Sequence, residues 1–196
     1  MNSKPDPDKI RFLVYTTIFG TLWGIAEAVA GTWLHMMQFP FRGALMAAIG
    51  CVALSIERSY TPHPWASLTT GLVAICFKMI SIGALRIFAA AGIAIEALIA
   101  EIIFLVFGLN RFSIALAAIF CCLESIPHFF FTNWLLYGNN VFNTYLKAAH
   151  IISKTLPFST QTAWLLFAFW IAGHLAIGAA AAYISIYSLR YLRRLK

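Results

Sequence analysis

Apolar residues are grouped along the chain into long runs, and short polar or Pro/Gly-containing breaks separate one run from the next. About 20 apolar residues are needed for a helix to cross a bilayer. In lipid every backbone amide and carbonyl must be satisfied within the chain, and the runs are too long and too rich in Ala, Leu and Ile for barrel strands. The pattern therefore predicts an all-α, polytopic integral membrane protein with six transmembrane helices. The expected spans lie near residues 10–35, 41–56, 64–82, 87–108, 112–136 and 161–188.

The longest break, residues 137–160, differs from the others because its apolar residues have a spacing close to one face of a helix. Asn, Lys and His stand between these apolar residues. We expect an external amphipathic segment here, which either closes over a binding site as a lid or lies in the membrane interface. Residues 1–196 as a whole are expected to form a single transmembrane domain.

The positive charges predict the orientation, because cytoplasmic connections carry more Lys and Arg than external ones. With six spans and the N-terminus inside, nine of the 14 basic residues fall on the cytoplasmic side and four outside, while Lys78 lies within the third span. The cytoplasmic residues are Lys4, Lys9, Arg11, Arg58, Arg111, Arg190, Arg193, Arg194 and Lys196. The external residues are Arg42, Arg86, Lys147 and Lys154. Both termini are therefore predicted to face the cytoplasm.

The composition excludes several classes of protein. Of the 196 residues, 61% are apolar and only 11% are charged, with a mean hydropathy of +0.82, which excludes an ordinary soluble domain. The net charge of +7 comes from basic residues spread along the topology, so no nucleic-acid partner is expected. The four cysteines lie inside apolar runs, and no disulfide framework is expected. The start of the chain lacks the features of a removed signal peptide, so the first helix is expected to remain as a span.

The candidate chemistry is a set of ionisable residues inside the predicted spans. Each charge near a helix centre costs roughly 2.5 to 3.5 kcal/mol on insertion scales, so such residues normally face a bundle interior or a cavity. The set consists of Glu27, Lys78, Glu96, Glu101, Glu124, His128 and His174. These residues either contact a ligand or form buried pairs and protonated carboxyls that hold the helices together. Glu27, Lys78 and Glu96 are the favoured ligand contacts.

The expected topology places most of this set between the midplane and the outer face of the membrane, with Glu101 about one turn deeper. Arg42, Arg86, Asn133 and the segment 137–140 lie at the outer mouth. A substrate pocket that opens outward follows from this arrangement, with these residues among its lining. The excess of carboxylates favours a ligand with donor or cationic groups, whereas the two arginines would receive a carboxylate or phosphate. The charge of the ligand therefore stays open.

The familiar catalytic motifs are missing from the sequence. There is no HExxH zinc helix, no GxSxG elbow, no GxxxxGK[ST] phosphate loop and no aspartate-rich magnesium motif. We therefore expect a protein that is not an enzyme and needs no cofactor, and ATP-driven transport would take its energy from another subunit. His63 and His150 have no ligand-like companions at helical spacing, so no metal site is expected.

Small residues at Gly20, Gly24 and Ala28 form one stripe along the first predicted helix. Such a stripe either packs against another helix of the same chain or contacts a partner membrane protein. Together with the size, six spans and inner termini, it resembles the substrate-binding S components of energy-coupling factor (vitamin-type ABC) transporters. The stretches 20–50 and 78–101 are also similar to uncharacterised S-component-like membrane proteins.

The resemblance implies capture of a vitamin or related micronutrient at the inner or plasma membrane of a prokaryote. It also implies contact between the stripe Gly20, Gly24 and Ala28 and a transmembrane coupling subunit driven by two ATPase subunits. Some family members specific for cobalamin use a cysteine as a cobalt ligand; Cys76 is either its counterpart or a small apolar residue of the core. The expected partners are thus a small-molecule substrate, membrane lipid and a coupling module.

Three functions remain open from the sequence. The leading hypothesis is a substrate-capturing membrane subunit for uptake of a vitamin-like small molecule. The second is a stand-alone proton- or cation-coupled carrier whose intramembrane glutamates titrate during transport. The third is a scaffold protein whose buried charges are purely structural.

Overall fold

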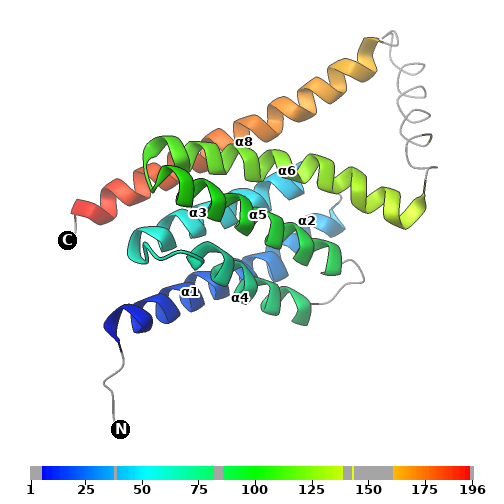
Figure 1. Ribbon diagram of the computed structural model, residues 1–196. Helices are drawn as coiled ribbons and strands as arrows, with labels where there is room; N and C mark the ends of the chain where they lie inside the picture. Colours follow the sequence, from blue (N-terminus) through cyan, green and yellow to red (C-terminus); the bar gives the residue numbers. More distant parts are fainter. Residues whose placement is uncertain (1–5, 38, 82–85, 139–142, 144–160, 195–196) are drawn as a thin grey trace.

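The computed structural model describes residues 6–37, 39–81, 86–138, 143 and 161–194, and within these ranges its regular structure is helical, with no strand (Figure 1). This confirms the predicted all-α class. The elements in chain order are α1 (Pro7–Ala26), η1 (Glu27–Gly31), α2 (Thr32–Met36), α3 (Arg42–Tyr60), α4 (Ala66–Ile80), α5 (Arg86–Phe107), α6 (Arg111–Tyr137) and α8 (Gln161–Arg194). The first three form one continuous helical segment, in which η1 is a π-helical turn.

These helices coincide with the apolar runs, and most ends lie within three residues of the expected bounds. Two helices extend further than expected: α3 continues past residue 56 to Tyr60, and α8 past residue 188 to Arg194. In both cases polar residues continue the helix beyond the apolar run. The external segment predicted over residues 137–160 lies, apart from a few positions, outside the described residues.

Among the described residues, four helices are long and apolar enough to cross a membrane. They are Pro7–Met36, Arg86–Phe107, Arg111–Leu136 and Leu165–Arg194. The apolar helix α4 has 15 residues and therefore a length of about 22 Å, against a hydrocarbon core of about 30 Å. The count of six spans, and the side of the membrane on which each end lies, thus stay predictions.

The helices form a bundle around α3, which contacts α1, α5, α6 and α8. α1 packs along α4, and α6 packs along α8. Trp23 of α1 is fully buried, and its indole ring lies so close to Gly50 of α3 that a Cβ there would be 2.6 Å from the ring. Figure 1 shows that α1 begins and α8 ends at the same end of the bundle, where the α3–α4 and α5–α6 connections also lie.

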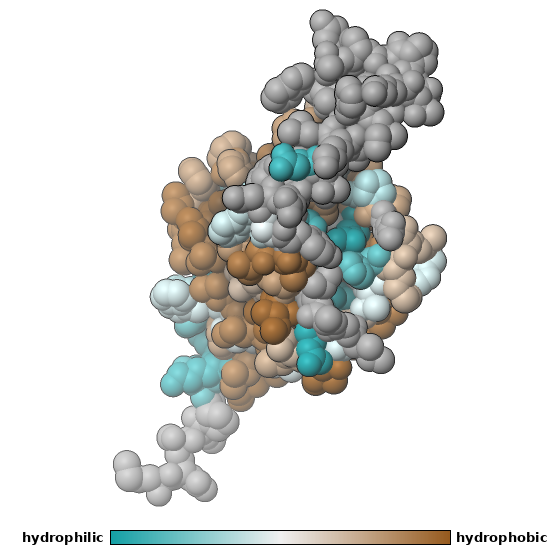
Figure 2. Space-filling model, turned by 90° about the vertical axis from the view of Figure 1, so that its right-hand side faces the viewer, coloured by the Kyte–Doolittle hydropathy of each residue, from teal (hydrophilic) through white to brown (hydrophobic). Residues whose placement is uncertain are grey.

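Much of the outer surface is apolar, which is the reverse of a soluble bundle. On α1 and η1 the side chains of Leu13, Leu22 and Val29 are 60%, 58% and 67% exposed. Figure 2 shows apolar side chains over a large part of the described surface that it presents. An apolar surface of this extent needs a hydrocarbon environment, so it supports the assignment of these helices to a membrane.

The small-residue stripe on α1 packs inside this chain. A Cβ at Gly20 would lie 2.6 Å from Cβ of Val73 and 2.7 Å from the Thr70 carbonyl oxygen, and one at Gly24 would lie 2.6 Å from Cβ of Phe77. All three neighbours belong to α4. Of the two roles that the sequence left open for Gly20 and Gly24, the structure therefore shows internal packing, and α4 occupies the face predicted for a coupling subunit.

Gly20→Ala is expected to lower the free energy of unfolding by about 1–3 kcal/mol, because the added methyl group forces α1 away from the α4 backbone. Gly92→Ala in α5 is the matched control, since a Cβ there would meet its nearest neighbour at an ordinary 3.6 Å. The control should be neutral or gain up to about 1 kcal/mol from helix propensity. Unfolding by SDS in mixed micelles, followed by tryptophan fluorescence, measures both; equal effects would refute the close α1–α4 contact.

Candidate functional site

The first pair of the candidate site joins η1 to α4. Nζ of Lys78 lies 3.4 Å from Oε2 of Glu27 and donates a hydrogen bond of 2.7 Å to the Glu27 backbone carbonyl. Both side chains are buried. A π-helical turn leaves carbonyls out of the regular i→i+4 ladder, and such turns occur frequently at functional sites. Lys78 therefore contacts the backbone carbonyl and the carboxylate of Glu27 together.

Gly31 closes the last turn of η1 next to this pair. A Cβ at Gly31 would lie 3.1 Å from Oε2 of Glu27 and 3.3 Å from Nζ of Lys78. The absence of a side chain therefore leaves room for the two charged groups to meet. Gly31 was not among the predicted site residues, because nothing in the sequence distinguishes it from the other 11 glycines.

Glu96 lies on α5 next to this pair and is buried. Its Oε2 atom has no hydrogen-bond partner among the described residues. Glu96 is close enough to Glu27 and Glu124 for electrostatic interaction with both. An unpartnered buried carboxyl oxygen costs free energy, so this atom is where an external donor would gain most.

Glu124 and His128 form the second pair, one turn apart on α6, with Oε1 of Glu124 3.4 Å from Nδ1 of His128. His128 also lies over α5, because a Cβ at Gly92 would be 3.6 Å from its ring. Gly92 precedes Glu96 by one turn of α5, so the His128 ring lies close to the Glu96 region of α5. The structure thus gathers five residues into one polar cluster, in which Glu27, Lys78 and Glu96 are buried and Glu124 and His128 are partly buried.

His174 belongs to a neighbouring aromatic cluster instead. Its ring lies 5.5 Å from the Phe41 ring and 5.1 Å from the Trp170 ring, and its Nδ1 is 2.7 Å from the Trp170 carbonyl oxygen. The indole of Trp170 donates a hydrogen bond of 3.2 Å to the carbonyl of Pro40. The arrangement ties α8 to the segment before α3, next to Arg42, where α3 begins.

Two residues predicted for the outer mouth bond to nearby backbone. Arg86 donates a hydrogen bond of 3.3 Å to the carbonyl of Met79, and Asn133 donates one of 2.7 Å to the carbonyl of Phe129. Cys76, the candidate cobalt ligand, is exposed, whereas Lys78 two residues later is buried. Cys76 therefore points away from the polar cluster.

Glu101, which is also buried, has a structural role at the other end of the bundle. Its Oε1 atom accepts hydrogen bonds from Arg58 (3.1 Å) and from the Trp65 amide (2.9 Å), and its Oε2 accepts one from the Ser67 amide (2.8 Å). These amides lie at the start of α4, where the N-cap residue Trp65 makes no side-chain capping hydrogen bond of its own. One carboxylate of α5 therefore caps α4 and pairs with α3.

Glu57 was not among the predicted site residues, because the apolar run of α3 was expected to end at residue 56. The structure continues α3 through this residue and buries it completely. Both of its carboxyl oxygens lack a partner among the described residues. Glu57 follows the apolar residue Leu54 by three positions, which places both on one face of a helix. In the sequence, this spacing was the available sign that Glu57 faces the core, where the structure buries both residues.

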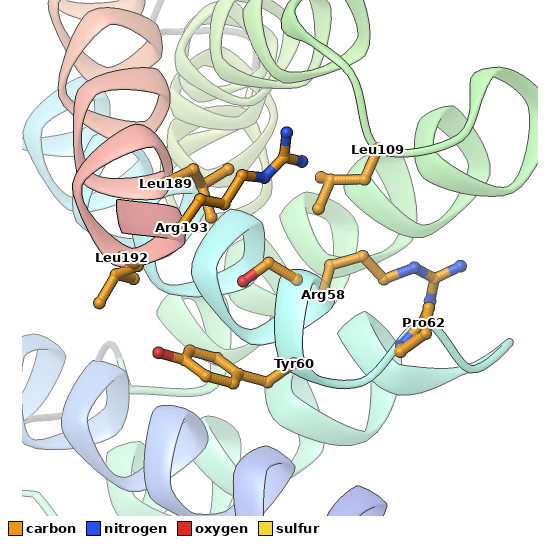
Figure 3. Close-up of a pocket in the computed structure, with 8 residues that line it drawn as sticks. Arg58, Tyr60, Pro62, Leu109, Leu189, Leu192 and Arg193 are labelled. Carbon is orange, nitrogen blue, oxygen red and sulfur yellow. The ribbon is translucent and has the colours of Figure 1, made fainter. Parts of the chain in front are cut away.

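Two cavities lie at the opposite end of the bundle from the Glu27–Lys78 pair. One of about 210 Å³ is lined by residues of α3, the α5–α6 connection and α8, including Arg58, Leu109 and Arg193 (Figure 3). The other, of about 230 Å³, adjoins it and includes Arg111 and Arg190. Neither has a residue predicted for the outward-opening substrate pocket in its lining.

Over the described residues, fold and surface together define an all-helical protein with helices suited to crossing a membrane and a polar cluster that is buried at Glu27, Lys78 and Glu96. Searches against family models, curated proteins and solved structures found no match to the chain. Within the described ranges, no three His, Cys, Asp or Glu side chains are grouped in a way that could hold a metal ion.

Proposed function

We propose that this protein is a substrate-capturing membrane subunit for uptake of a vitamin or related small micronutrient. The observation that carries the proposal is the buried Oε2 of Glu96, which has no partner among the described residues although it lies near the buried Glu27–Lys78 pair and the partly buried Glu124–His128 pair. The six spans, cytoplasmic termini and coupling to ATPase subunits expected from the sequence belong to the same proposal. The captured molecule would bind at the polar cluster of Glu27, Lys78, Glu96, Glu124 and His128.

The cluster favours a ligand that carries a hydrogen-bond donor or a cationic group. Lys78 is already engaged by the carboxylate and carbonyl of Glu27, and His128 is engaged by Glu124. The unpartnered Oε2 of Glu96 can accept a hydrogen bond, and one from a cationic donor contributes about 1.5–3 kcal/mol. Of the two ligand classes that the sequence left open, we therefore propose the one with donor or cationic groups, and its donor would point at Glu96.

A proton- or cation-coupled carrier is the second candidate, and one observation favours it. Glu96 lies within electrostatic reach of two further carboxyl groups, Glu27 and Glu124. Carboxyl groups that interact electrostatically in a low-dielectric environment disfavour one another's ionisation, so not all of them are expected to be charged together. A carrier needs a titrating group of this kind, whereas a capturing subunit does not.

Native mass spectrometry of the detergent-purified protein tests the first proposal. We expect a retained small molecule at one per chain, and Glu96→Gln should lower its retention about tenfold or more because a charge-assisted hydrogen bond is lost. Glu57→Gln is the matched control: it changes another buried carboxyl, at the far end of the bundle, and should retain the ligand.

Three outcomes would count against capture. An empty protein without a co-purifying coupling subunit, or equal loss of ligand from Glu57→Gln, would contradict it. So would substrate movement by the protein alone in liposomes under a pH gradient, which would instead establish the carrier.

A further inference from the structure

Four arginines gather at the end of the bundle where α1 begins and α8 ends. They line the two adjoining cavities described above, which share Leu109, Leu189 and Arg193. The arginines are Arg58, Arg111, Arg190 and Arg193. No acidic residue is among the lining residues of either cavity. The cavities therefore present a strongly positive surface.

Three of these guanidinium groups are available to a ligand. Arg58 is engaged by Glu101 and by the carbonyl of His63. In contrast, Arg111, Arg190 and Arg193 have no ion pair or hydrogen bond within the part of the chain that the structure describes. Figure 3 shows the Arg193 guanidinium extending between Leu189 and Leu109, while the Arg58 side chain runs toward Pro62.

The size and the walls of the cavities limit what can bind. Each is smaller than the roughly 300–1,000 Å³ typical of sites for drug-sized ligands. The walls below the arginines are apolar and include the buried residues Ile114 and Leu189. A small anionic group that continues into an apolar chain fits this combination, and guanidinium groups match the oxygens of a phosphate in charge and geometry.

The outer face of α8 indicates that this end lies at a membrane interface. Tyr183, Tyr187 and Tyr191 are 71%, 62% and 57% exposed and follow one another at four-residue spacing, so they form a single stripe. Exposed tyrosines are enriched where the headgroup layer meets the hydrocarbon core. Arg190 and Arg193, which line the cavities, lie on the last turns of the same helix.

We infer that the cavities formed by Arg111, Arg190 and Arg193 with Leu109 and Leu189 bind the phosphate group of an anionic phospholipid. The phosphate lies among the guanidinium groups, and the start of an acyl chain lies against the leucines. Basic pockets between membrane helices bind anionic headgroups elsewhere by the same physics. The site lies apart from the polar cluster at Glu96, so it is independent of the proposed substrate.

The test uses purified full-length protein loaded with phosphatidylglycerol or with phosphatidylcholine, and native mass spectrometry counts the lipid molecules that remain bound. We expect phosphatidylglycerol to be retained preferentially, and Arg193→Gln to lower its retention about tenfold because a charge-assisted contact is lost. Arg194→Gln is the matched control, because this arginine is the next residue of α8, is exposed and lines neither cavity. The Arg194→Gln variant should retain phosphatidylglycerol. The Arg193→Lys variant should keep part of the preference for phosphatidylglycerol over phosphatidylcholine.

Three results would overturn the inference. Equal retention of the two lipids would remove the role of anionic charge at the site. Equal loss from Arg193→Gln and Arg194→Gln would show general surface attraction. Displacement of phosphatidylglycerol by millimolar glycerol 3-phosphate would assign the site to a soluble phosphate compound. Thermal unfolding of each variant checks that the fold survives.

Discussion

Glu101→Ala is expected to lower the free energy of unfolding by about 3–5 kcal/mol, the range measured when one partner of a buried ion pair is removed. The substitution leaves the buried Arg58 guanidinium without its carboxylate and the amides of Trp65 and Ser67 without their acceptor. All three groups lie where α3, α4 and α5 meet. Unfolding by SDS in mixed micelles, followed by tryptophan fluorescence, measures the loss.

Glu57 provides the control for this experiment. It is as deeply buried as Glu101, but its carboxyl oxygens have no partner among the described residues. Glu57→Met keeps a side chain of similar size and removes the unpaired polar atoms, so the free energy of unfolding should stay unchanged or rise. A loss as large as that of Glu101→Ala would mean that the Glu57 carboxyl makes a stabilising contact. A small loss from Glu101→Ala would contradict its role in joining α3, α4 and α5.

The second large effect is expected from Lys78→Met. Methionine preserves the length and most of the packing of the side chain but removes the charge that neutralises Glu27 and the donor to its carbonyl. A buried carboxylate is left unpaired, and the expected loss is again about 3–5 kcal/mol in the free energy of unfolding. The same SDS titration applies.

A double-mutant cycle separates the pair from the rest of the helix contact. Lys78→Met combined with Glu27→Gln removes both charges, so its loss should be smaller than the sum of the two single losses by about 0.5–3 kcal/mol. Strictly additive losses would show that the two side chains do not interact, and the 3.4 Å contact would then have no energetic weight.

The positions of the helices could be predicted from the sequence because the apolar runs and their breaks are local features. The partner of each buried charge could not be predicted, since Glu27 and Lys78 are 51 residues apart and meet only through the rotation and tilt of α1 and α4. The same holds for Gly20 and Gly24: small residues predict a close helix contact, but not which helix makes it. Glu57 was missed because a polar residue at the end of an apolar run can equally begin a connection.

The contacts of Glu101 with α3 and α4 also have a consequence for the assembly of the bundle during synthesis. Arg58 precedes Glu101 by 43 residues. At about 5–20 residues per second, Glu101 therefore leaves the ribosome roughly 2–9 s after Arg58. During that interval α3 and α4 are already synthesised, but the first turn of α4 has no cap from α5. Completion of this end of the bundle therefore waits for the synthesis of α5, and a pause in translation before Glu101 would prolong the exposure of the unpaired arginine.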